Sequence, residues 1–185
     1  MTKEIKKAWN WRWSELVNKI ERVQTYFDKQ ALLDKLCRPQ KPCVLAFVNA
    51  HAMNLLSKSE SFFDSLCAAD IVLRDGSGME TLFNQLNMPP GLNLNGTDLI
   101  PDLVRQFNGR SIAMLGTEEP YLYSGAQFVK INLAPQSEYF LENGFLADED
   151  YISLIILHKP ALIILGMGMP RQEQVAVALR KKISH

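Results

Sequence analysis

Short apolar runs alternate with segments of helical periodicity along most of this chain. Four runs have the length and composition of buried parallel strands: residues 43–48, 71–73, 111–115 and 161–165. Helical patterns lie between them, most clearly over Asp148–His158, and Tyr139 or Phe140 could sit on a further short strand. Strands joined by helical crossovers predict an α/β protein with a Rossmann-like layered fold, in which a mainly parallel sheet is flanked by helices.

Length and composition are those of one ordinary globular domain. The chain has 185 residues, of which 47% are hydrophobic and 22% charged, so a sizeable core can form and disorder is not expected. We expect an N-terminal arm and helix over residues 1–40 and a Rossmann-like core over residues 41–185. The 20 basic and 20 acidic residues balance, which removes the global electrostatic case for nucleic-acid binding.

Cysteine usage and hydropathy indicate the compartment. Cys37, Cys43 and Cys67 form no C-x-x-C pair, which argues against a zinc site and against a disulfide framework. The first residues lack the apolar core of a secretory signal, and the longest apolar runs fall far short of the roughly 20 residues that a transmembrane helix needs. We therefore expect a reduced, cytoplasmic protein.

The N-terminal segment combines a basic aromatic patch with a helical stripe. The patch consists of Lys3, Lys6, Lys7 and Arg12, interleaved with Trp9, Trp11 and Trp13. It could bind a membrane surface or a polyanion, but we favour a solvated arm with a few docked aromatic side chains. Apolar residues from Leu16 through Val23 and Phe27 to Ala31 recur at helical spacing, which predicts one helix that Ser14 could cap.

Polar residues and glycines cluster directly after the expected strands. Asn49 and His51 follow the first strand, Asp75 the second, Gly116 the third, and the segment Gly166–Gln172 the last. Because parallel strands end at a common edge, where such folds bind ligands, we expect a binding site there.

The last of these junctions is the most specific. Two glycines and Pro170 lead from an apolar run into a helical segment, and unpaired N–H groups at such a helix start favour an anion such as phosphate. Arg171 and Gln172 could reach a phosphate or sugar oxygen. A plain strand-to-helix turn that binds nothing is the alternative.

Several nucleotide and acyl-transfer motifs are missing from the sequence. The first strand is followed by Asn-Ala-His rather than Gly-x-Gly, and Arg171 stands where the third glycine of a dinucleotide-binding turn belongs. No Walker A lysine motif occurs, and Gly76-Ser-Gly78 lacks the spacing of a nucleophile elbow. Dinucleotide binding, ATP hydrolysis and acyl transfer are therefore disfavoured.

Five motifs occur in order along the chain: Val48–Asn54, Ala69–Gly76, Asn95–Asp98, Met114–Gly116 and Leu165–Glu173. Together they resemble the WecG/TagA/CpsF family of bacterial glycosyltransferases. The resemblance implies an inverting hexosyltransferase without metal or other cofactor, which moves an N-acetylmannosamine or glucose type of sugar from UDP to a polyprenyl-diphosphate-linked acceptor. It also implies a peripheral protein at the inner face of the cell membrane, active in cell-surface polysaccharide or teichoic acid synthesis. A homo-oligomer is left open.

The resemblance assigns roles residue by residue. Asp75 matches the aspartate proposed as general base, and a carboxylate suits the removal of a proton from an attacking hydroxyl; capping the helix that begins near Gly78 is the structural alternative. For Asp98 we favour capping or bracing its helix. The substrate-binding candidates are Asn49, His51, Gly76, Gly96, Asp98, Gly116, Gly166, Gly168, Arg171 and Gln172.

The chain departs from the family pattern at three positions and in length. Arg74 replaces a proline, Phe47 a threonine and Asn93 an arginine. Relatives continue with another strand and a tail, so we expect a truncated or naturally short member whose membrane association is weakened. The second hypothesis is therefore a catalytically silent family member that binds nucleotide-sugar or a protein partner.

Overall fold

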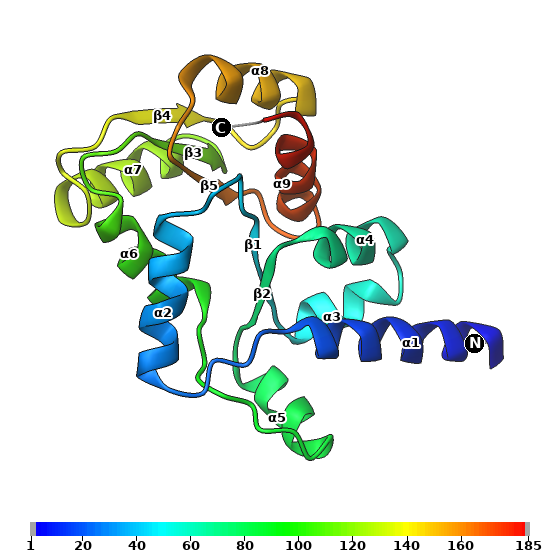
Figure 1. The fold of residues 1–185 in the computed structure, drawn as a ribbon. Helices are drawn as coiled ribbons and strands as arrows, with labels where there is room; N and C mark the ends of the chain where they lie inside the picture. Colours follow the sequence, from blue (N-terminus) through cyan, green and yellow to red (C-terminus); the bar gives the residue numbers. More distant parts are fainter. Residues whose placement is uncertain (1–2, 184–185) are drawn as a thin grey trace. The chain divides into compact units, whose positions relative to one another are not determined.

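The computed structural model describes residues 3–183, with side chains from Trp11 onward, and shows an α/β fold (Figure 1). Every strand pair is parallel, which confirms the expected α/β, Rossmann-like class. The chain forms two compact units: unit 1 runs to Leu32 and resumes over Cys43–Gly96, whereas unit 2 comprises Leu33–Pro42 and the chain from Thr97 onward. None of the helices between residues 3 and 183 is long and apolar enough to cross a membrane.

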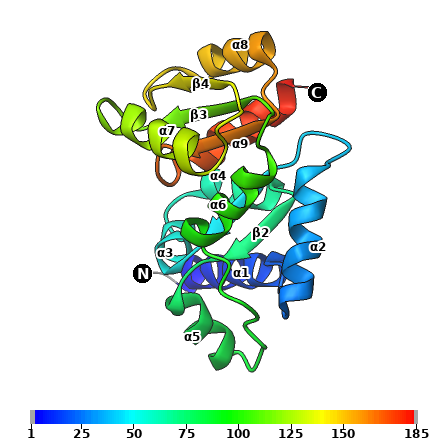
Figure 2. The ribbon, with the colours of Figure 1, turned by 90° about the vertical axis from the view of Figure 1, so that its left-hand side faces the viewer.

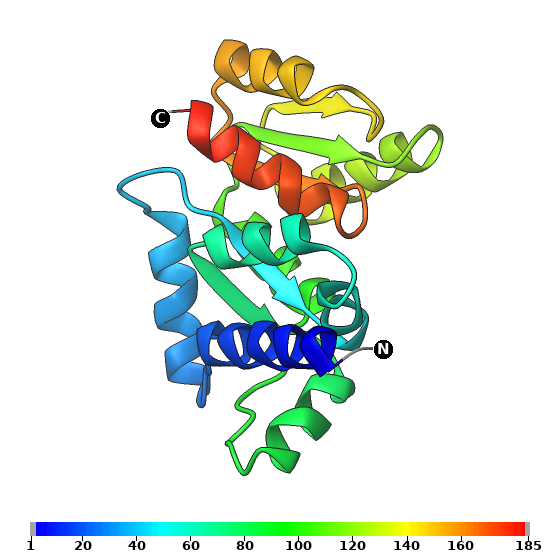
Figure 3. The ribbon, with the colours of Figure 1, turned by 90° about the vertical axis from the view of Figure 1, so that its right-hand side faces the viewer.

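Unit 1 contains a two-stranded sheet of β1 (Leu45–Val48) and β2 (Ile71–Arg74). Helices α1 (Lys3–Lys19), α3 (Ala50–Leu56) and α4 (Glu60–Ala68) pack against one another, and α3 packs on β1 (Figure 3). Helix α5 (Ser77–Gln85) follows β2, and α2 (Tyr26–Cys37) begins in unit 1 and ends in unit 2. The two strands run in register, so both end at one edge.

Unit 2 contains a three-stranded sheet in the order β4 (Tyr139–Glu142), β3 (Ile112–Gly116) and β5 (Leu162–Gly166). Helix α7 (Tyr121–Asn132) lies on one face, and α8 (Asp148–His158) and α9 (Arg171–Lys182) lie on the other (Figure 2); α6 (Gly96–Gln106) precedes β3. The core between β3, α8 and α9 is built from Ala113, Leu115, Tyr151, Ile155, Val175 and Leu179. The expected helix over Asp148–His158 and the short strand at Tyr139 are confirmed.

The single helix expected from Leu16 to Ala31 is wrong, because the chain leaves the helix after Lys19. The Glu21 N–H donates to the Val72 carbonyl at 2.8 Å, which draws this segment alongside β2. A second helix, α2, starts at Tyr26, and Ser14 lies inside α1 rather than at its start. The helical spacing of apolar residues therefore continues through a segment that is not helical.

The basic aromatic segment forms the helix α1, and the expected docking of aromatic side chains is confirmed for Trp13. Trp13 Nε1 donates to the Met53 carbonyl at 2.9 Å, and Arg12 donates to the Leu56 carbonyl at 3.1 Å, so this helix is docked on α3. The side chains of Lys3, Lys6, Lys7 and Trp9 lie outside the described residues. The boundary expected near residue 40 stays a prediction.

Candidate functional site

The structure brings Asn49 and Asp75 to the same edge of the unit 1 sheet. Val48 and Arg74 are register partners at the ends of β1 and β2, and the Asp75 N–H donates to the Val48 carbonyl at 2.8 Å. Each of the two site candidates therefore emerges one residue beyond a matched strand end.

The Asp75 carboxylate has no hydrogen-bond or ion-pair partner among the described side chains and backbone groups. The residue is partly buried. Helix α5 begins at Ser77 after Gly76, which has a φ of 85° and provides no side-chain cap. The structural alternative, in which Asp75 caps this helix, has no hydrogen bond to support it, because Gly76 stands at the cap position.

Asn49 is held by the helix that follows it. Its Oδ1 accepts from the Ala52 N–H at 3.0 Å and so caps α3, while its Nδ2 has no acceptor in the described part of the chain. His51 lies exposed in the first turn of the same helix. The cap fixes the Asn49 side chain and leaves its amide nitrogen as a donor.

Gly76, Gly96 and Asp98 each have a structural role within the chain. The Gly76 N–H donates to Asn93 Oδ1 at 2.9 Å, so this N–H is already used within the protein. Gly96 opens α6, and Asp98 is an exposed residue of its first turn, where a carboxylate complements the helix dipole. Their ligand roles stay predictions.

The glycines at the ends of β3 and β5 allow close backbone packing in unit 2. Gly116 and Gly166 are register partners, and the Thr117 N–H donates to the Gly166 carbonyl at 3.1 Å. A Cβ on Gly116 would lie 2.4 Å from the Gly166 carbonyl carbon, and Gly116 has a φ of 151°. Glycine at position 116 is therefore required by packing, whatever it binds.

The turn from β5 to α9 presents N–H donors. The Gly168 N–H donates to Gln172 Oε1 at 3.2 Å, and Gln172 Nε2 in turn donates to Glu173 Oε1 at 2.9 Å. The N–H groups of Met169 and Arg171 have no acceptor between residues 3 and 183. Such unpaired donors at a helix start can bind an anion.

Sequence reasoning missed Glu173. Its side chain is 5% exposed, its Oε2 has no hydrogen-bond partner among the described residues, and burial raises the pKa of its carboxyl group. A charged residue early in a helix is usually exposed, so its place in the sequence gave no signal beyond membership of the last motif. The structure adds it to the turn from β5 to α9 as a support for Gln172.

Arg171 is engaged within unit 2. Its NH1 forms an ion pair with Asp148 Oδ1 at 2.6 Å, in a geometry that is not that of a hydrogen bond. Its NH2 donates to the Leu146 carbonyl at 2.9 Å. These contacts brace the segment before α8. A phosphate-binding role for Arg171 stays a prediction, and it would have to compete with these partners.

Comparison with known proteins agrees with the motif resemblance. A model of the "Glycosyl transferase WecG/TagA/CpsF family" matches residues 19–185. The chain is 22% identical over 163 residues to N-acetylglucosaminyldiphosphoundecaprenol N-acetyl-beta-D-mannosaminyltransferases of Staphylococcus aureus, among them those of strains NCTC 8325 / PS 47 and COL. The match covers 86% of this chain and 61% of the relatives, so the chain spans less than two thirds of their length.

Proposed function

The chain belongs to the WecG/TagA/CpsF family of glycosyltransferases, and on that basis we propose that it transfers a sugar of the N-acetylmannosamine or glucose type from UDP to a polyprenyl-diphosphate-linked acceptor. The observation that carries the proposal is the Asp75 carboxylate, which stands at the end of β2 without a partner among the described residues. The transfer would serve the synthesis of a bacterial cell-surface polysaccharide or teichoic acid.

The proposed reaction is a displacement with inversion at the anomeric carbon. The acceptor hydroxyl oxygen forms the new bond to this carbon, its proton passes to Asp75, and the bond to the UDP oxygen breaks with its electron pair leaving on UDP. Asn49 Nδ2 supplies a donor for a sugar or acceptor oxygen. Within unit 2, the N–H groups of Met169 and Arg171 at the turn before α9 are a separate candidate for binding an anion such as phosphate.

The test is sugar transfer by the purified chain with UDP-N-acetylmannosamine or UDP-glucose and a polyprenyl-diphosphate-N-acetylglucosamine acceptor. Asp75→Asn keeps the size of the side chain but removes the proton acceptor, so turnover should fall about 10²- to 10⁴-fold, while calorimetry shows unchanged UDP binding. Asp64→Asn changes an exposed aspartate of α4 and serves as the matched control. Near-normal turnover in a folded Asp75→Asn variant would refute the assignment.

The proposed chemistry uses no metal or other cofactor, as the resemblance implies. The proton acceptor in the proposed step is a side chain of the chain itself. Turnover should therefore persist in the presence of EDTA. Loss of turnover with EDTA, restored by a divalent cation, would contradict this part of the proposal.

A catalytically silent nucleotide-sugar binder is the second candidate, and Phe47 is the observation that favours it. Phe47 lies on β1 two residues before Asn49, and residues two apart in an extended strand face the same side, so an aromatic ring stands where the family has a hydroxyl. Binding of UDP-sugar without transfer would support this candidate. A gain of turnover in Phe47→Thr would then identify the ring as the cause.

The acceptor sets the proposed location. A polyprenyl-diphosphate is anchored in the bilayer, so the reaction belongs at the inner face of the cell membrane, with this chain as a peripheral protein. Co-flotation with vesicles that contain the acceptor, compared with vesicles that lack it, tests this expectation. Equal recovery from both kinds of vesicle would argue against acceptor-dependent association.

A further inference from the structure

Arg74 is a buried cation directly before the candidate base, and the proposed chemistry does not use it. Its side chain is 4% exposed. Burial lowers the pKa of Arg74, and the Glu80 carboxylate, 3.8 Å away, acts in the opposite direction. An arginine stays charged in proteins, so this guanidinium must be satisfied by polar partners.

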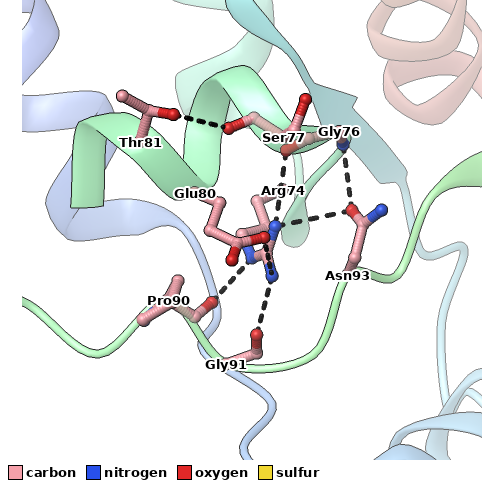
Figure 4. Close-up of polar contacts among 8 residues, drawn as sticks. All are labelled: Arg74, Gly76, Ser77, Glu80, Thr81, Pro90, Gly91 and Asn93. Carbon is pink, nitrogen blue, oxygen red and sulfur yellow. Dashed lines mark hydrogen bonds and ion pairs between the residues drawn. The ribbon is translucent and has the colours of Figure 1, made fainter. Parts of the chain in front are cut away.

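The partners are backbone carbonyls of the loop that follows α5 (Figure 4). Arg74 Nε donates to the Pro90 carbonyl and Arg74 NH2 to the Gly91 carbonyl, both at 2.7 Å. Hydrogen bonds from an ionised donor are about twice as strong as neutral ones. The loop is anchored in turn, because the Leu92 N–H donates to the Val23 carbonyl at 2.7 Å.

Asn93, from the same loop, closes the arrangement on the other side of Asp75. Its Oδ1 accepts from the Gly76 N–H at 2.9 Å and from Arg74 NH1 at 3.5 Å, while Arg74 NH1 also contacts the Gly76 carbonyl at 3.4 Å (Figure 4). Both polar groups of the Gly76 backbone are therefore engaged. This matters because glycine is the residue with the greatest backbone freedom, and Gly76 holds a φ of 85°.

We propose that Arg74 and Asn93 form a clamp that holds the turn through Asp75 and Gly76 in one conformation. The Asp75 N–H is fixed to the Val48 carbonyl on the strand side, and the clamp fixes the next residue on the loop side. Arg74 and Asn93 are positioning residues: they touch the backbone that carries the candidate base and not its carboxylate. Their effect on catalysis rests on the proposed function, whereas the clamp itself does not.

The clamp is tested by amide hydrogen exchange at Gly76, measured by NMR on the whole chain. Asn93→Ala removes the acceptor from an exposed position, so the Gly76 amide should exchange about tenfold faster. Asn93→Asp keeps an oxygen acceptor at the same place and should retain the protection. Thr81→Val, which removes a bond to the Ser77 carbonyl in the same helix, is the control and should leave Gly76 unchanged.

The variants also separate positioning from a general loss of structure. In Asn93→Ala and Arg74→Lys, kcat should fall about tenfold while KM for the UDP-sugar stays constant; a lysine keeps the charge but not the planar fork that holds two carbonyls. Unchanged exchange at Gly76 in Asn93→Ala would overturn the clamp, and unchanged kcat with faster exchange would overturn its positioning role. If the wild-type chain transfers no sugar, the proposed function fails, and the Gly76 exchange alone decides the clamp.

Discussion

Replacing Glu173 by glutamine should stabilise the protein at neutral pH and leave it unchanged in acid. The carboxyl group is 5% exposed, and its Oε2 has no partner in the described part of the chain. Burial raises the pKa of Glu173 above its ordinary value of 4.5. Below that value the folded and unfolded states both hold the proton, so the group contributes nothing to the pH dependence.

Above pH 4.5 the unfolded chain releases the proton first, and the folded state binds more protons. Stability therefore falls as pH rises through the folded pKa, and stays lower beyond it. A buried acceptor left without a partner costs about 1–3 kcal/mol, and more when it is charged. Glutamine leaves a terminal NH2 group without a partner where Oε2 stood, but it removes the charge, and its Oε1 can still accept from Gln172. Glu173→Gln should therefore recover the charge-related part of the cost, about 1–3 kcal/mol at neutral pH.

The measurement is urea unfolding followed by circular dichroism, over a pH series from about 4.5 to neutral. The gain in the free energy of unfolding should shrink towards zero at the acid end. Glu149→Gln alters an exposed carboxylate in the first turn of α8, and should shift stability by less than about 0.5 kcal/mol. A gain that is independent of pH, or a loss at neutral pH, would refute the argument.

Two further variants test structural roles of candidate site residues. Gly116→Ala places a Cβ 2.4 Å from the Gly166 carbonyl carbon and should lower the free energy of unfolding by about 1–3 kcal/mol. The control Gly125→Ala, with nothing near its Cβ in α7, should instead raise the free energy of unfolding by about 0.5–1 kcal/mol. Equal effects of the two substitutions would contradict the packing argument. Arg171→Met removes a partly exposed ion pair with Asp148 and should cost about 0.5–1 kcal/mol of stability. If calorimetry shows unchanged UDP affinity in this variant, Arg171 braces the loop; a loss of about 1–3 kcal/mol in binding would assign it to phosphate.

The elements that the sequence predicted well are those with strong local signals. Each apolar run that was expected to be a strand is one, because a strand buried on both faces needs a continuous apolar stretch. Helix α8 has the expected bounds, since acidic residues fill its first turn and Pro160 follows its end. The order of Asn49 and Asp75 after matched strand ends followed from the parallel arrangement alone.

The break between α1 and α2 was missed because a buried apolar residue of the loop falls at the spacing expected of a helix. Val23 is 5% exposed although it lies between the helices, whereas Phe27, next in the same spacing, is 83% exposed. A signal for the second helix start was present in the sequence. Thr25 and Asp28 form a capping box, in which each side chain accepts from the other residue's N–H.

The hydrogen-bond partners of long polar side chains could not be predicted from the sequence. They depend on which segments, far away in the sequence, the tertiary structure places next to those side chains. Arg74 was noted only as a departure from the family pattern, and Arg171 only as a cation that could reach phosphate. Each instead contacts carbonyl groups from a segment that lies elsewhere in the sequence, at Pro90 and Gly91 for Arg74 and at Leu146 for Arg171.

These contacts change the roles that we expect for the two arginines. The guanidinium groups of Arg74 and Arg171 are both occupied by acceptors within their own units, so neither stands ready as a free cation for the diphosphate. At the turn before α9, the N–H groups of Met169 and Arg171 have no acceptor among the described residues. Arg74 and Arg171 therefore each fix a loop within their own unit, and an anion at the turn before α9 would be bound by backbone N–H groups.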